Sequence, residues 1–167
     1  QRFLGTLASL GLAEQGPDRR YGVGPGIHCL SALSLSASGL VRRAATHLPA
    51  LEDLGLNIAV GVLWRDTVSY LYFHVPGQPA ARALGKETGW PADQSSIGRL
   101  LMACRERPDQ PAPDHVCVVH PNHEHSLAVP VGAPPRAALA VSGEFSTTRI
   151  PELRARLHAA ARDLSPL

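Results

Sequence analysis

Residues 2–23 read RFLGTLASLGLAEQGPDRRYGV, and this stretch decides how the start of the chain folds. Its first part carries apolar residues at helical spacing, namely Phe3, Leu4, Leu7 and Leu10. Gly11 predicts the end of that helix, because glycine adopts the left-handed conformation without a side-chain clash. The remainder predicts two short strands around a Gly-Pro-Asp turn at residues 16–18. A short helix followed directly by a basic-tipped hairpin is typical of the end of a winged helix, a DNA-binding unit.

Length and composition limit the class of protein. The chain has 167 residues, enough for one sizeable core and a fragment of a second unit. Its apolar content of 44% and charged content of 18% are typical of a soluble globular protein. A net charge of +2 does not indicate nucleic-acid binding by itself, and the arginines near the start also fit an ordinary solvated surface.

Cysteine usage and hydropathy indicate the compartment. The three cysteines, Cys29, Cys104 and Cys117, have no spacing typical of a disulfide framework, which favours a reducing cytoplasm. No apolar run approaches the length needed to span a membrane. We therefore expect a cytoplasmic protein with no membrane partner.

Three parts are expected along the chain. Residues 1–26 form the C-terminal part of a winged helix-turn-helix, residues 27–38 a linker helix, and residues 39–167 a larger domain. The larger domain is expected to contain helices at 40–54, 95–105 and 150–164. Its expected strands lie at 56–64, 68–75, 80–84, 116–119, 126–131 and 137–142. Helices that flank a mostly antiparallel sheet make an α+β fold.

Three segments of the chain resemble the IclR family of bacterial transcriptional regulators. The first is residues 2–26, which end in the exit sequence YGVGP at residues 21–25. The second is WPADQSSIGRLLMA at residues 90–103. The third is LAVPV at residues 127–131, followed by AALAVSG at residues 137–143 and a final helix. The order and spacing of these segments extend the resemblance over nearly the whole chain.

The resemblance implies a regulator and not an enzyme. It implies a winged-helix domain truncated at its start, a linker helix used in dimerisation, and a GAF-like effector-binding domain. The implied partners are a double-stranded DNA operator, a small-molecule effector and a second copy of the chain, with a tetramer left open; no cofactor is implied. On this resemblance Gln1 and Arg2 lie on the recognition helix, and Arg19 and Arg20 lie on the wing.

The resemblance also implies an effector site at the start of the helix at residues 95–105. Its backbone amides at Ser96 and Ile97 are the positions that receive an anionic effector, and a helix N-terminus suits an anion because its N–H groups are unpaired. The family's pocket cysteine falls at Ser126, and its two late-strand serines fall at Ala140 and Ser142. The implied effector-binding residues are Trp90, Ser95, Ser96, Ile97, Ser126, Ala140 and Ser142.

The segment between this helix and the strand at 126–131 is much shorter than is usual in the family. It carries a cluster of metal-binding residue types, His115, Cys117, His120, His123, Glu124 and His125. Their spacing fits no standard zinc finger, and Pro121-Asn122 signals a turn. One interpretation is a polar loop that replaces the missing family insert. The alternative is a metal- or ligand-binding sensor module whose metal ligands are His120, His123 and His125.

Catalytic patterns do not favour an enzyme. The sequence lacks a G-x-S-x-G nucleophile motif and a Walker phosphate loop. It offers no nucleophile, base and orienting group at a recognisable spacing.

Overall fold

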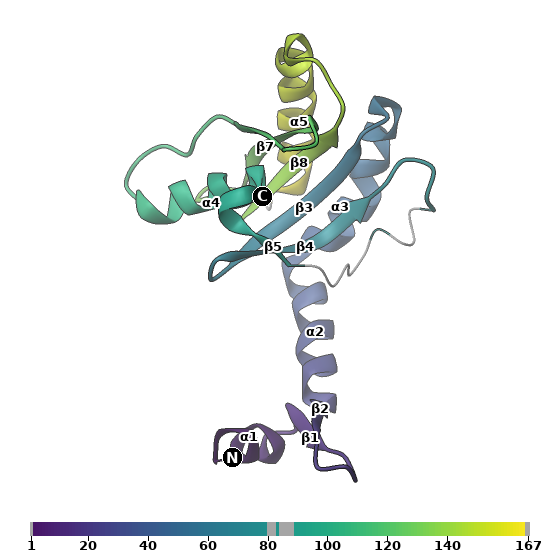
Figure 1. Cartoon of the computed structure of the whole chain (residues 1–167), viewed down its shortest axis with the longest axis vertical. Helices are drawn as coiled ribbons and strands as arrows, with labels where there is room; N and C mark the ends of the chain where they lie inside the picture. The colour runs from purple at the N-terminus through teal and green to yellow at the C-terminus, as the bar shows by residue number, and fades with distance from the viewer. Residues whose placement is uncertain (1, 80–82, 84–88, 166–167) are drawn as a thin grey trace. The chain divides into compact units, whose positions relative to one another are not determined.

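A computed structural model describes residues 2–79, 83 and 89–165 (Figure 1). The chain divides into two compact units, residues 1–39 and residues 40–167, and each is described by itself. Within the described part of the chain, no helix is both long enough and apolar enough to cross a bilayer.

The first unit is a helix, a hairpin and a longer helix. It comprises α1 (Arg2–Ser9), β1 (Ala13–Gln15), β2 (Tyr21–Val23) and α2 (Pro25–Ser38), with β1 and β2 antiparallel. Gly11 has a φ of 67°, so the left-handed stop predicted after α1 is present. The large apolar side chains Phe3, Leu10 and Leu33 remain exposed in this unit.

The second unit is built on a curled six-stranded antiparallel sheet (Figure 1). Its strand order is β5-β4-β3-β8-β7-β6. The strands are β3 (Asn57–Trp64), β4 (Thr67–His74), β5 (Trp90–Pro91), β6 (Val116–Val119), β7 (His125–Val131) and β8 (Ala137–Gly143). Helices flank this sheet, which confirms the α+β class predicted from the sequence.

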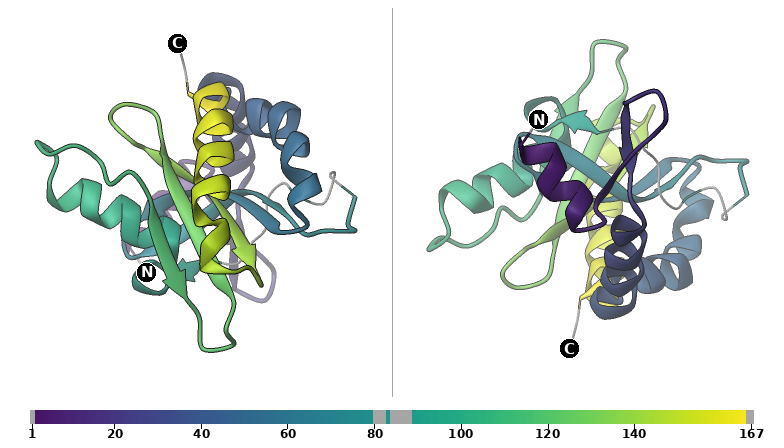
Figure 2. Two further views of the ribbon diagram at one scale, coloured as in Figure 1. Left: turned by 90° about the horizontal axis from the view of Figure 1, so that it is seen from above. Right: turned by 90° about the horizontal axis from the view of Figure 1, so that it is seen from below.

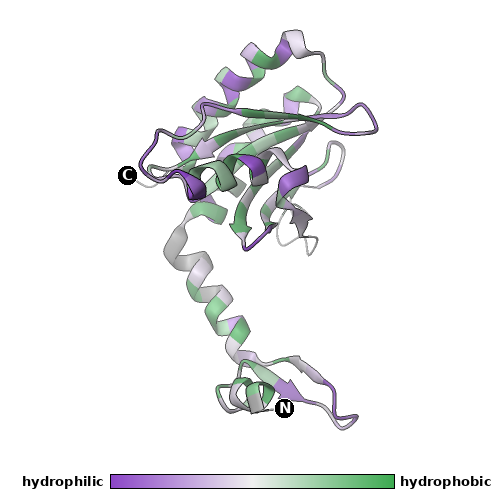
Figure 3. Ribbon diagram, turned by 60° about the vertical axis from the view of Figure 1, so that its left-hand side comes forward, coloured by the Kyte–Doolittle hydropathy of each residue, from purple (hydrophilic) through white to green (hydrophobic). Residues whose placement is uncertain are grey.

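Period-two alternation gives the sheet two different faces. In β7 and β8 the larger side chains, such as Leu127, Leu139 and Val141, join a core with α5 (Ile150–Leu164) and α3 (Leu40–His47). Figure 2 shows α5 lying along this face of the sheet. On the opposite face the alanines Ala128 and Ala140 pack with α4 (Ser96–Glu106). The colouring of Figure 3 shows apolar residues concentrated in these strands.

Two expectations about the connections change. The single helix expected at residues 40–54 is an α-helix only to His47 and continues as a 3₁₀ helix, η1 (Leu48–Leu54). Pro49 explains the change, because proline has no N–H to donate to a continuing α-helix. The strand expected at residues 80–84 lies, apart from the buried Ala83, outside the described residues.

Candidate functional site

A cavity of about 490 Å³ opens where the start of α4 meets the sheet. It is lined by Asn57, Ala59, Tyr70, Phe73, Trp90, Ser95, Ser96, Ile97, His120, Pro121, Asn122, Glu124, Ser126, Ala140, Val141 and Ser142. Every effector-site residue implied by the sequence resemblance is in this set. The structure therefore brings together residues that lie as far apart in the sequence as Asn57 and Ser142.

The start of α4 supplies hydrogen-bond donors to this cavity. Ser95 caps the helix, since its Oγ accepts a hydrogen bond from the Gly98 amide at 3.3 Å. The amides of Ser96 and Ile97 belong to the first turn, where no intrahelical acceptor exists, and no other acceptor for them is found among the described residues. They are consequently free to bind an acceptor on a ligand.

Glycines hold this end of α4 close to its neighbours. A Cβ at Gly98 would overlap the backbone of Ala92, which belongs to the 3₁₀ helix η3 (Ala92–Gln94) just before α4. A Cβ at Gly61 of β3 would come within 2.8 Å of Val68 Cγ1 and 3.3 Å of Ile97 Cγ2. Both positions need a residue without a side chain.

Tyr70 of β4 ties the cap to the sheet. Its hydroxyl is hydrogen-bonded to Ser95, and its ring meets Phe73 edge to face at 5.3 Å between centroids. Burial raises the pKa of Tyr70, and the hydrogen bond from Ser95 opposes that rise only in part. The phenol therefore stays neutral at physiological pH.

The floor of the cavity is apolar in its middle and polar along one side. Ala59 and Ala140 are partner residues of β3 and β8, and their short side chains leave space below α4. Ser142 pairs with Ser126 across β8 and β7, and its Oγ accepts a hydrogen bond from Asn57 Nδ2 at 3.4 Å. Trp90 of β5 lines the cavity with 45% of its surface exposed, which places it at the rim.

The turn between β6 and β7 contributes a wall that the sequence did not predict. His120 Nε2 lies 3.0 Å from Ser126 Oγ, and Asn122 and Glu124 also line the cavity. The available signal was the histidine-containing segment before β7, which the sequence resemblance marks as unusually short. Asn57, Tyr70 and Phe73 were also missed, because nothing in their local sequence distinguishes them from other strand residues.

The predicted metal ligands do not converge. His123 is exposed in the turn with a φ of 64°, and His125 packs its ring against Phe145 at 5.3 Å. His120 instead reaches Ser126. Within the described part of the chain, which includes the whole cluster, no three His, Cys, Asp or Glu side chains are placed to hold a metal ion. The structure gives no support to the metal-site alternative.

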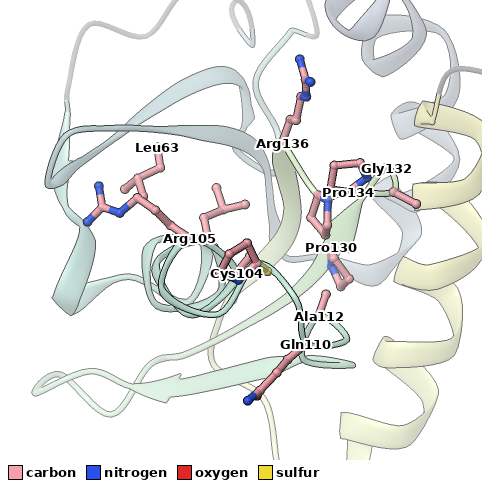
Figure 4. A pocket seen from close by; sticks show the side chains of 13 residues that line it. Leu63, Cys104, Arg105, Gln110, Ala112, Pro130, Gly132, Pro134 and Arg136 are labelled. Atoms are coloured by element: carbon pink, nitrogen blue, oxygen red, sulfur yellow. The ribbon is translucent and has the colours of Figure 1, made fainter.

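A second cavity, of about 550 Å³, lies at the other end of α4 (Figure 4). It is lined by Leu101 and Cys104 of the helix, by Pro130 of β7, and by residues of the neighbouring loops, which include Pro108, Gln110, Pro134, Pro135 and Arg136. Arg105 points away from it and donates to the Arg65 carbonyl at 2.8 Å. Burial raises the pKa of the Cys104 thiol, so this sulfur is a neutral, weakly polar group.

The expected DNA contacts belong to the first unit. Gln1 lies outside the described residues, and Arg2 is the first residue of α1. Arg19 and Arg20 are exposed in the turn of the β1–β2 hairpin, whose tip is hydrophilic in Figure 3. Arg20 Nε lies 3.6 Å from Asp18 Oδ2, a surface ion pair.

No protein-family model matches the chain, and no match to a curated protein is found. Solved structures do match. A putative IclR regulator from Silicibacter sp. TM1040 is 18% identical, with a TM-score of 0.73 over 98% of this chain and 80% of its own. The C-terminal domain of the Escherichia coli transcriptional regulator KdgR is 22% identical, with a TM-score of 0.60 over 75% of this chain and 96% of its own.

A third match is an IclR homologue from Microbacterium hydrocarbonoxydans complexed with 4-hydroxybenzoate. It is 19% identical, with a TM-score of 0.58 over 98% of this chain and 82% of its own. All three matched proteins are described as transcriptional regulators or IclR homologues. The chain has the fold of the IclR-family transcriptional regulators, and its second unit has the fold of their C-terminal domain.

Proposed function

We propose that this protein is a bacterial transcriptional regulator that binds operator DNA as a dimer and senses a small molecule in the cavity at the start of α4. The cavity carries the proposal, because it combines unpaired helix amides, buried hydroxyls and an apolar floor in one concave site. The regulators that share the fold support it. By linkage, an effector changes DNA affinity only as far as it distinguishes two conformations of the protein.

A thermal-shift screen of aromatic and aliphatic carboxylates tests the sensor part. The first probe is 4-hydroxybenzoate, the compound bound by the Microbacterium homologue. A ligand at 100 times its dissociation constant adds about 2.7 kcal/mol to the free energy of unfolding, which is visible as a raised midpoint. A complete screen without a shift contradicts the sensor function.

A matched pair of substitutions locates any binding. Ala140→Leu fills the floor of the cavity at the start of α4, whereas Ala112→Leu fills the wall of the second cavity with the same added volume. We expect Ala140→Leu to abolish the ligand-induced shift and Ala112→Leu to leave it intact. The reverse result would place the effector at the wrong end of α4.

The DNA-binding part rests on the hairpin of the first unit. Arg19 and Arg20 are exposed at its turn, where a wing contacts the phosphate backbone. The double variant Arg19→Ala/Arg20→Ala should weaken binding to duplexes selected from a random pool and reduce the salt slope by about 2. The double variant Arg42→Ala/Arg107→Ala, which removes two exposed arginines of the second unit, is the control.

Dimerisation is assigned to α2. Its apolar side chains at Ile27, Leu30 and Leu33 are exposed at helical spacing, although such residues are normally buried. We expect sedimentation equilibrium to give a dimer, and Leu30→Asp/Leu33→Asp to shift it to the monomer. A monomeric parent protein would contradict this assignment.

A further inference from the structure

The cavity at the start of α4 has two polar ends with an apolar middle. One end is the first turn of α4, and the other is the pair formed by His120 and Ser126. The residues between them, Ala59 and Ala140, are short and apolar. A ligand that fills this cavity therefore needs a polar group at each end and an apolar middle.

The α4 end is fixed over the β3–β4 side of the sheet. Ser95 is hydrogen-bonded to Tyr70 of β4, and Ile97 lies against Gly61 of β3. Its donors are the amides of Ser96 and Ile97, with the dipole of α4 behind them. An anionic group such as a carboxylate is the natural occupant of this end.

The opposite end is fixed over β7. Ser126 is 6% exposed, so its hydroxyl needs a partner, and His120 Nε2 supplies one at 3.0 Å. The turn holds the imidazole in place, because the His120 amide donates to the Glu124 carbonyl at 2.8 Å and its carbonyl accepts from the His123 amide at 2.9 Å. Both a serine hydroxyl and a neutral imidazole can donate as well as accept a hydrogen bond.

Strand order and register separate the two ends of the cavity. β8 separates β3 from β7, so the two ends lie over different strands. Gly61 pairs with Ala138 whereas Ser126 pairs with Ser142, so the ends also lie at different levels along the strands. The paired alanines Ala59 and Ala140 form an apolar surface between them, and Phe73 pairs with Ala59 on the neighbouring strand. An elongated ligand with polar groups at opposite ends and an apolar middle matches this arrangement.

The charges of the cavity lining restrict which polar group of a ligand can bind at the His120 end. Among the described residues that line the cavity there is no Lys or Arg; the ionisable side chains are Tyr70, His120 and Glu124. Tyr70 is neutral, and Glu124 belongs to the same turn as His120. A second anionic group at this end would face the Glu124 carboxylate, whereas a hydroxyl would not be repelled.

We propose that His120, held by Ser126, is the residue that selects the effector by hydrogen bonding to a neutral polar group at the end opposite the effector's carboxylate. This inference rests on the proposed function of the cavity. It assigns to His120 a role in recognition of an organic ligand in place of the metal-binding role considered from the sequence.

The test is a cycle of ligand and protein changes measured by isothermal titration calorimetry. Benzoate, 4-hydroxybenzoate and terephthalate are titrated into the parent protein and into His120→Phe, which keeps a flat ring but has no ring nitrogen. The parent should prefer 4-hydroxybenzoate over benzoate by about tenfold, the value of one neutral hydrogen bond, and should bind terephthalate no better than benzoate. His120→Phe should reduce the preference for the hydroxy acid to about one and leave benzoate affinity unchanged.

A second variant tests whether any substitution in the β6–β7 turn alters ligand binding. His123→Phe changes an exposed residue of the same turn that does not line the cavity, so it should keep the tenfold preference. Equal binding of benzoate and 4-hydroxybenzoate by the parent overturns the role of His120 but leaves the cavity as an effector site. If His120→Phe keeps the preference for 4-hydroxybenzoate over benzoate, the role of His120 is likewise overturned while the cavity remains an effector site. Absence of binding by all three acids overturns both this inference and the proposed sensor site for aromatic acids.

Discussion

The two ends of α4 face cavities of similar size that are lined by different kinds of polar group. The cavity at the start of the helix measures about 490 Å³, and the one at its other end about 550 Å³. At the start, the backbone offers free amides and the side chains offer hydroxyls. At the other end, four of the lining residues are prolines, which have no N–H to donate, and the polar side chains are those of Arg105, Gln110 and Arg136. Volume alone therefore does not make a recognition site; groups that donate hydrogen bonds in a fixed direction do.

The same contrast appears in the ionisable groups beside the helix. Burial raises the pKa of Tyr70 at one end and of Cys104 at the other. Tyr70 has a hydrogen-bonding partner in Ser95 that opposes the effect of burial, whereas burial is the only cause found at Cys104. The start of α4 thus carries a polar network of buried groups, whereas the other end is rich in proline and has its polar groups on long side chains.

Leu100 packs the middle of α4 against the sheet, so truncating its side chain should have the largest effect on stability. Leu100 is fully buried among Ala138, Ala140 and the other residues below α4. We expect Leu100→Ala to lower the free energy of unfolding by about 3 kcal/mol, because it removes buried methyl groups and leaves a void. Urea denaturation measures this change. Met102→Ala, on the half-buried side of the same helix, should cost clearly less; equal costs would contradict the assignment of Leu100 to the core.

Adding volume at the start of α4 should have the next largest effect. Gly98→Ala forces its new methyl group against the backbone of Ala92 and should cost about 2 kcal/mol. It should also weaken any carboxylate ligand, because the amides of Ser96 and Ile97 move with the helix. Gly5→Ala in α1 is the control, since a Cβ there meets nothing within 4 Å. If Gly98→Ala is as stable as the parent, the close approach of α4 and Ala92 is wrong.

How far the sequence predicts this region depends on whether the signal is local. The helix at residues 150–164 and the strand at residues 116–119 were predicted with the observed bounds, because apolar spacing is a local pattern. The 3₁₀ segment after His47 was not, because the apolar spacing predicted one helix over residues 40–54 and does not show where α-helical hydrogen bonding ends near Pro49. Strand order is not local at all: nothing near Asn57 indicates that β8 will lie beside β3.

For the candidate site, too, the sequence predicts what depends on local signals and misses what depends on the packing of distant segments. Ser96, Ile97 and Ser126 were identified through a resemblance to known regulators, and they do line one cavity. His120 was noticed, but as a metal ligand, because residue type and spacing do not show which way a turn closes. Its place beside Ser126 follows from the pairing of β6 with β7, in which Val118 lies opposite Ser126.

Removing the helix cap gives a smaller effect that has two independent readouts. Ser95→Ala should cost about 1 kcal/mol of stability, since the Gly98 amide loses its acceptor. It should also raise the pKa of Tyr70 further, because the hydrogen bond from Ser95 is the contribution that lowers it. An NMR titration of the tyrosine ring follows that shift. Ser146→Ala removes the cap of the short helix η4 (Thr147–Arg149) and should leave Tyr70 unaffected.

The smallest expected effect is on the reactivity of the cysteine thiols at and near the C-terminal end of α4, and not on the stability of the protein. The nucleophile in alkylation is the thiolate, so a raised pKa at Cys104 and Cys117 lowers the reactive fraction at neutral pH. Cys29 is exposed on α2 and should react with iodoacetamide first, while Cys104 should react at least about tenfold more slowly. Its rate should rise with pH until the raised pKa is passed. Mass spectrometry of the labelled protein, with Cys29→Ser as a comparison, separates the sites. Rapid labelling of Cys104 at neutral pH would show that the proline-lined end of α4 is open and solvated. That result would remove the contrast between the two ends.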